Sequence, residues 1–108
     1  LGVLQNRGFK VALVTDGRMS GASGKVLAAI QVSPEAMCGG LIGKVRDGDI
    51  VTVDVRSGTL QVAGDEIAAR EAEVVEPVRH GLGRELFAAF RERASAAESG
   101  GSLFARDF

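Results

Sequence analysis

The sequence predicts a mixed α/β domain, and three patterns lead to this prediction. A continuous apolar run at 10–14 is typical of a strand buried on both faces. Alternating residues at 50–55, then a turn and an extended run at 59–62, indicate a β-hairpin. Apolar residues recur at helical spacing within 84–97. A chain of 108 residues can bury one modest core, so we expect a single domain over 1–108.

The first half of the chain predicts a helix end at 1–9, a strand at 10–14 and a Gly-rich loop at 15–24. A short helix or strand at 25–30 and a short helix at 33–38 follow. Gly8 is suited to the cap after the first helix. Ser33 and Pro34 are suited to the N-cap and the first helical position of the last one. Gly39 and Gly40 end that helix.

The second half predicts a strand at 41–45, a turn at 47–49 and a hairpin at 50–62. A charged helix at 65–73 and a final helix at 84–97 follow. Residues 99–102 are a flexible exit. Phe104 and Phe108 are apolar for a free tail, and we expect them to dock on a neighbour. Cys38 follows Met37 at an apolar helix end, which predicts a small core residue.

The composition excludes several classes of function. A net charge of −1 provides no field for nucleic acid or anionic membranes, and without Trp or Tyr a base-stacking surface is not expected. One cysteine and one histidine exclude a disulfide framework, a multi-cysteine zinc site and a two-histidine metal site. No signal peptide and no apolar run of about 20 residues is present, so we expect a cytoplasmic location. The start at Leu1 suggests a fragment or a processed product.

The loop 15–24 carries most of the chemical information because a Gly-rich loop after a buried strand is a usual binding position. It fails three known patterns: the phosphate-binding P-loop, the nucleophile elbow and the dinucleotide fingerprint. Backbone N–H groups near its glycines could still form an anion site. Arg18 could bind a carboxylate or phosphate through two N–H groups, and Ser20 could approach a substrate closely. The alternative is a plain connecting loop in which Asp16 bonds its own backbone.

Ten consecutive residues of this loop (Val14-Thr15-Asp16-Gly17-Arg18-Met19-Ser20-Gly21-Ala22-Ser23) resemble the C-terminal signature of the dihydroxy-acid / 6-phosphogluconate dehydratase family. Residues 32–36, 39–40 and 45–50 are also similar to that family. Residues 1–5, 21–26 and 83–87 are most similar to its 6-phosphogluconate dehydratase branch. The chain departs from the family at Gln31, where His is common, and at 41–42, where Pro is common.

The resemblance implies a hydro-lyase that converts a 2,3-dihydroxy acid into a 2-keto-3-deoxy acid. For this branch the substrate is 6-phospho-D-gluconate, in the Entner–Doudoroff pathway. The family's base is the signature serine, which corresponds to Ser20. The resemblance makes the neighbouring loop residues candidates for binding substrate (Asp16, Gly17, Arg18, Gly21, Ser23), and Lys25 is a candidate for the 6-phosphate.

The resemblance also implies an iron–sulfur cluster and a divalent metal such as Mg²⁺. A cluster needs several cysteines, and Cys38 is alone. The resemblance implies that the cluster cysteines and the metal carboxylates lie upstream, so we expect both groups in an N-terminal catalytic domain, with a homodimer as the full-length enzyme. The implied fold is a swivelling β/β/α domain with a barrel-like mixed sheet and flanking helices. Two alternatives stay open: a dehydratase of another sugar acid or of branched-chain dihydroxy acids, and a non-catalytic anion-binding module.

Overall fold

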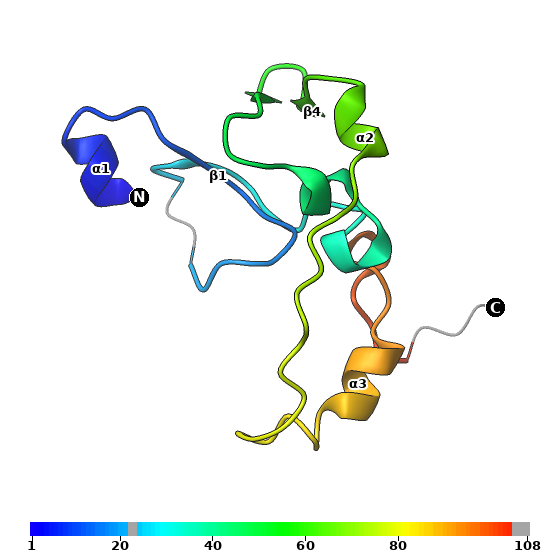
Figure 1. The fold of residues 1–108 in the computed structure, drawn as a ribbon. Coiled ribbons are helices and arrows are strands. Elements are labelled where there is room, and N and C mark those ends of the chain that lie inside the picture. The colour runs from blue at the N-terminus through cyan, green and yellow to red at the C-terminus, as the bar shows by residue number, and fades with distance from the viewer. Residues whose placement is uncertain (22–23, 105–108) are drawn as a thin grey trace. The chain divides into compact units, whose positions relative to one another are not determined.

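A computed structural model describes residues 1–21 and 24–104, and Figure 1 shows the fold. The chain divides into two compact units, Leu1–Ala72 and Glu73–Phe108, which are described separately below. Short helices and short strands together confirm the mixed α/β class. Within the described ranges the strands form two two-stranded sheets, and a barrel-like sheet stays a prediction. No helix in this part of the chain is long and apolar enough to cross a membrane.

A short helix and a parallel pair of strands open the first unit. Helix α1 (Gly2–Asn6) is followed by Gly8 at φ +90°, which confirms a helix end with glycine after it. Strand β1 (Ala12–Val14) pairs in parallel with β2 (Leu27–Ala29), so the apolar segment 25–30 contains a strand. The expected burial of β1 on both faces was wrong, because Ala12 is exposed and the two residues after it are half-buried.

An antiparallel hairpin is the second sheet of this unit, as predicted. Strand β3 (Val51–Asp54) pairs with β4 (Thr59–Val62), with Val51 opposite Val62 and Asp54 opposite Thr59. The turn forms because the Asp54 carboxylate accepts the Arg56 N–H at 2.8 Å and Gly58 adopts φ +67°. Half-buried and exposed residues alternate along both strands, which is the period-2 pattern that predicted them.

The first short helix after the parallel strands starts later than expected. The 3₁₀ helix η1 spans Ala36–Cys38 and follows Glu35, whose backbone is extended at φ −65° and ψ 156°. Ser33 is therefore not the N-cap, and the helix is confined to one turn. Gly39 ends it in the left-handed conformation at φ +83°, as predicted.

The strand expected at 41–45 was wrong, because Leu41–Lys44 form a second 3₁₀ helix, η2. An apolar run this short fits a helix or a strand equally well. Local packing decides the outcome. The Gly43 N–H donates to the Gly40 carbonyl at 3.1 Å, and a Cβ on Gly43 would lie 3.1 Å from the Ala36 Cβ. The missing side chain at Gly43 thus lets the two turns approach each other.

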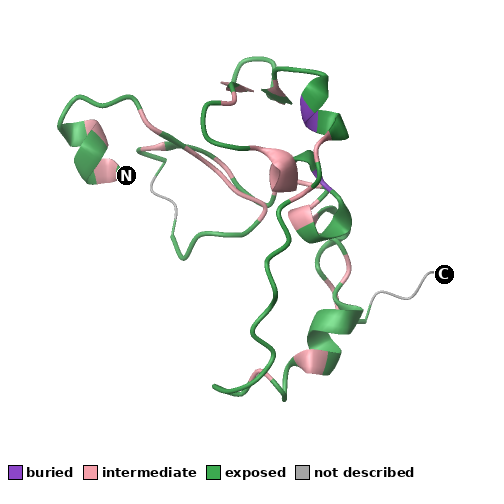
Figure 2. Cartoon of the chain, viewed as in Figure 1, coloured by how far each residue is buried: buried purple, intermediate pink, exposed green. Residues whose placement is uncertain are grey.

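Helix α2 (Glu66–Ala69) is much shorter than the predicted helix at 65–73. It carries Ile67, the one buried hydrophobic residue in the part of the chain that the structure describes, at 2% exposure (Figure 2). The Lys44 ammonium donates to the Ala68 carbonyl at 2.6 Å and joins η2 to this helix.

The second unit contains α3 (Ala88–Arg93) and the 3₁₀ helix η3 (Ala97–Ser99). The predicted helix at 84–97 thus forms only over its central part, and turns precede it. The rings of Phe87 and Phe90 lie 5.8 Å apart and supply the apolar contact that the spacing predicted. Phe104 is 87% exposed, and Phe108 lies outside the described residues.

Candidate functional site

The first three residues of the Gly-rich loop (15–17), which we call the stem, are hydrogen-bonded at the carboxyl end of β1. The Thr15 N–H donates to the Ala29 carbonyl at 2.9 Å, and the Thr15 carbonyl accepts the Val32 N–H at 3.1 Å. The Gly17 carbonyl accepts the Gln31 N–H at 2.9 Å, and the Gly17 N–H donates to the Thr15 hydroxyl at 3.0 Å. These bonds extend the β1–β2 pairing beyond the strands and fix the direction in which the loop leaves the sheet.

Asp16 connects the stem to a different part of the unit. Its Oδ2 accepts the backbone N–H of Ala36, the first residue of η1, at 2.9 Å. Asp16 is half-buried, whereas Gly17 and the residues after it are exposed. The alternative in which Asp16 bonds its own backbone is replaced by two observed contacts: Thr15 forms the local turn bond, and Asp16 forms a long-range one.

Two candidate residues, Arg18 and Ser20, lie at the tip of the loop. Arg18, Met19 and Ser20 line one hollow on the surface, and all three side chains are exposed. A Cβ on Gly21 would meet no atom of the described residues within 4 Å. The structure therefore brings a hydroxyl and a guanidinium to one accessible place, as a site for an anionic substrate requires.

The remaining candidates lie further along the loop. Ser23 is outside the described residues. Lys25 is exposed, and its carbonyl accepts the Gln5 amide N–H at 2.8 Å, which joins the end of the loop to α1. Among the described residues its ammonium makes no hydrogen bond or ion pair with the tip residues, so the structure places Lys25 directly after the loop without joining it to Ser20.

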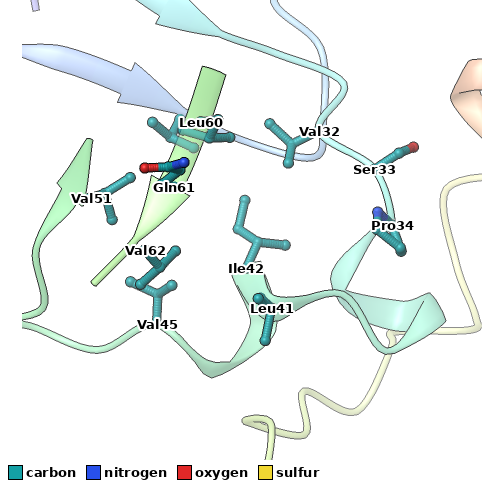
Figure 3. A pocket seen from close by; sticks show the side chains of 11 residues that line it. Val32, Ser33, Pro34, Leu41, Ile42, Val45, Val51, Leu60, Gln61 and Val62 are labelled. Atoms are coloured by element: carbon teal, nitrogen blue, oxygen red, sulfur yellow. The ribbon is translucent and has the colours of Figure 1, made fainter. Parts of the chain in front are cut away.

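A second hollow, which sequence reasoning missed, lies between β1, η2 and the hairpin (Figure 3). It has a volume of about 760 Å³ and mainly apolar walls (Val14, Val32, Ser33, Pro34, Leu41, Ile42, Val45, Val51, Leu60, Gln61, Val62). The Ser33 hydroxyl is buried without a hydrogen-bond partner among the described residues. The sequence carried one signal for this hollow. The inward-facing residues of the alternating strands β3 and β4 needed a surface to pack against.

The chain has too few cysteines for an iron–sulfur cluster, and the side chains of the described residues do not gather into a site for a divalent metal. A cluster is held by several cysteine thiolates, and the chain has only Cys38. Cys38 is exposed, so the expectation of a core residue was wrong. Within residues 1–21 and 24–104, no three His, Cys, Asp or Glu side chains come together as a metal site. His80 is also exposed, with its Nδ1 3.8 Å from the Glu85 carboxylate.

Comparison with known families identifies the origin of this loop. The model of the dihydroxy-acid/6-phosphogluconate dehydratase C-terminal family matches residues 2–101. The chain belongs to this family. The match includes the stem, the tip and both units, so the resemblance drawn from the signature is confirmed.

Individual relatives agree. The chain is 59% identical over 102 residues to the phosphogluconate dehydratase of Zymomonas mobilis, with 93% of the chain and 17% of that protein covered. It is 58% identical over 104 residues to the Escherichia coli K12 enzyme of that name, with the same coverage. Dihydroxy-acid dehydratase 2 of Mesorhizobium japonicum is 50% identical over 68 residues, which are 61% of the chain and 11% of that protein. The chain thus spans about a sixth of the length of the first two relatives.

Proposed function

We propose that this chain is the C-terminal domain of a hydro-lyase that dehydrates 6-phospho-D-gluconate to 2-dehydro-3-deoxy-6-phosphogluconate, and that Ser20 is the base. The observation that carries the proposal is the exposed Ser20 beside Arg18 on a loop that an anchored stem presents. Relatives named phosphogluconate dehydratase at 58–59% identity favour this substrate over other sugar acids and branched-chain dihydroxy acids.

In this proposal Ser20 takes the proton from C2 of the substrate. The C3–oxygen bond breaks, and the leaving hydroxide accepts the proton that Ser20 took from C2 and departs as water. The resulting enol then tautomerises to the 2-keto acid. A serine hydroxyl is a weak base, and a nearby cation favours its deprotonated form. Arg18 lines the same hollow and supplies positive charge there. Its two-pronged guanidinium is suited to the substrate carboxylate.

The loop supplies the remaining contacts. Backbone N–H groups near Gly17 and Gly21 orient substrate oxygens, Ser23 adds a hydroxyl, and Lys25 binds the 6-phosphate. Because the chain has too few cysteines for an iron–sulfur cluster and its described side chains do not gather into a site for Mg²⁺, we assign both to an upstream N-terminal domain of the same polypeptide. The swivelling, barrel-like architecture, the homodimer and the cytoplasmic location belong to the same proposal for the full-length enzyme.

The test uses the full-length enzyme with Ser20→Ala. Turnover of 6-phosphogluconate should fall by about 1,000-fold or more, while cluster absorbance and thermal stability stay at the wild-type level. Ser99→Ala is the matched control at an exposed serine of the second unit and should leave turnover unchanged. Near-normal turnover in Ser20→Ala would contradict the base role. Faster turnover of gluconate or 2,3-dihydroxyisovalerate than of 6-phosphogluconate would contradict the substrate.

A further inference from the structure

Among the described residues, the hydrogen bond between Asp16 and Ala36 is the one side-chain hydrogen bond from the loop stem to a segment outside the β1–β2 pair. The two residues are 20 positions apart, and the Oδ2–nitrogen distance is 2.9 Å. Asp16 precedes Ser20 by four residues, and Ala36 begins η1. An acceptor oxygen 2.9 Å from a backbone nitrogen lies at the ordinary hydrogen-bond distance, so this bond ties the stem to η1.

The tip of the loop lacks comparable anchors. Thr15, Asp16 and Gly17 all form hydrogen bonds at the stem. From Arg18 to Gly21, no backbone or side-chain hydrogen bond to another described residue is found. Among the described contacts, those of the stem are therefore the ones that position the Ser20 hydroxyl. A movement of the stem by 1 Å changes the alignment of a reacting group enough to cost about 100-fold in rate.

We propose that Asp16 is a positioning residue: its carboxylate holds the stem against the Ala36 N–H and so sets where Ser20 meets the substrate. This inference rests on the proposed function of Ser20. It assigns Asp16 a different task from the substrate contact that the sequence suggested. An acceptor oxygen is what the task requires, and a negative charge is not.

Two substitutions at Asp16 in the full-length enzyme separate the two tasks. Asp16→Asn keeps an acceptor oxygen and should retain kcat within about threefold, whereas Asp16→Ala should lower kcat by about 10- to 100-fold. KM for 6-phosphogluconate should change by less than about threefold in both variants, because no substrate contact is removed. An equal loss of kcat in the two variants, or a large rise in KM, would overturn the proposal.

The donor can be removed as well, with Ala36→Pro. Glu35 is already extended at φ −65° and ψ 156°, as a residue before proline requires, and proline is favoured at a first helical position. Ala36→Pro should lower kcat as much as Asp16→Ala does. The double variant should be no worse than either single one, because both remove the same bond. Losses that multiply would overturn the proposal.

Amide hydrogen exchange distinguishes this inference from the base role. Exchange of the Ala36 N–H should accelerate by about 10-fold or more in Asp16→Ala and stay near wild type in Asp16→Asn. This measurement does not depend on turnover. If Ser20→Ala stays active, the base role fails while the exchange still shows whether the anchor exists. Unchanged exchange in Asp16→Ala would overturn the anchor itself.

Discussion

Arg70 donates a hydrogen bond from Nη1 to the Oδ2 of Asp49 at 2.6 Å, and this ion pair joins the residue after α2 to the turn before the hairpin. The same oxygen accepts the Arg46 N–H at 2.8 Å. The guanidinium of Arg70, helped by that N–H, holds the pKa of Asp49 below its ordinary value of 3.8. The two contacts close this part of the first unit around Ile67, which lies three residues before Arg70.

The lowered pKa of Asp49 predicts a dependence of stability on pH. A carboxyl whose pKa is lower in the folded state contributes stability above its unfolded pKa and loses it as the pH falls through the folded pKa. In the full-length protein, the opening free energy of α2 from hydrogen exchange should therefore fall on acidification below about pH 4. Asp49→Asn should flatten this fall, whereas Asp47→Asn removes an exposed carboxylate from the same turn and should not. Parallel curves for Asp49→Asn and wild type would contradict the prediction.

The close packing around Gly40 predicts that the turn between η1 and η2 has no room for a side chain. Gly40 is buried, and a Cβ at this position would collide with the Pro34 carbonyl oxygen. Gly40→Ala should destabilise the turn by about 1–3 kcal/mol or more and accelerate amide exchange across η1. Gly2→Ala is the control, since a Cβ there meets nothing within 4 Å. Wild-type exchange in Gly40→Ala would show that the turn has room for a side chain.

The left-handed backbone of Gln31, beside the loop stem, predicts how substitutions there change local stability. Gln31 has φ +52°, although it is neither glycine nor asparagine, and its N–H donates to Gly17. The left-handed conformation costs about 1–2 kcal/mol and is worst for β-branched residues. Gln31→Val should therefore lower local stability by about that amount, while Gln31→Gly should preserve or raise it. Gln61→Val, in β4, is the control, because valine favours strands. Equal effects of valine at the two positions would contradict the argument.

The proposed contact of Lys25 with the 6-phosphate predicts that replacing Lys25 weakens substrate binding. If the Lys25 ammonium binds the 6-phosphate, Lys25→Ala should raise KM for 6-phosphogluconate by about 10- to 100-fold, the cost of a charged hydrogen bond. Turnover of gluconate, which has no phosphate, should stay as it is. Lys10→Ala removes another exposed lysine near β1 and serves as the control. An unchanged KM in Lys25→Ala would make Lys25 a surface lysine.

Local patterns predicted the parts of the fold that depend on neighbours in the sequence. The hairpin followed from the alternation at 50–55, the extended run at 59–62 and the turn residues at 56–58, all of which act over a few residues. The 3₁₀ helix at Leu41–Lys44 was taken for a strand, because its form depends on Gly43 approaching Ala36. No periodicity reports such a contact.

In the candidate site too, features set by neighbouring residues could be predicted and features set by distant contacts could not. The position of the loop followed from an apolar run that ends in glycines, and the tip residues Arg18 and Ser20 came from the signature. The Asp16–Ala36 bond crosses 20 residues and depends on where η1 begins, two residues later than Ser33 as N-cap suggested. Sequence spacing identified the residue types, whereas the fold decided which of them form the stem and which lie at the exposed tip.

The shortage of buried apolar surface predicts how the chain behaves by itself. Ile67 is the one buried hydrophobic residue among those described, and burying it contributes about 1.5–3 kcal/mol. Ordering the backbone costs about 1–2 kcal/mol per residue, so one such side chain cannot hold the first unit together. Two-stranded sheets are at best marginally stable alone, and parallel ones are normally covered on both faces.

Residues 1–108 in isolation should therefore show no cooperative transition in urea, whereas the same residues in the full-length enzyme should resist exchange as one unit. Ile67→Ala provides the matched test. It should change the isolated chain little, because no packed core is lost, and should lower local stability in the full-length enzyme by about 2–5 kcal/mol. A steep urea transition of the isolated chain, lost in Ile67→Ala, would show instead that the chain folds without the remainder of the enzyme.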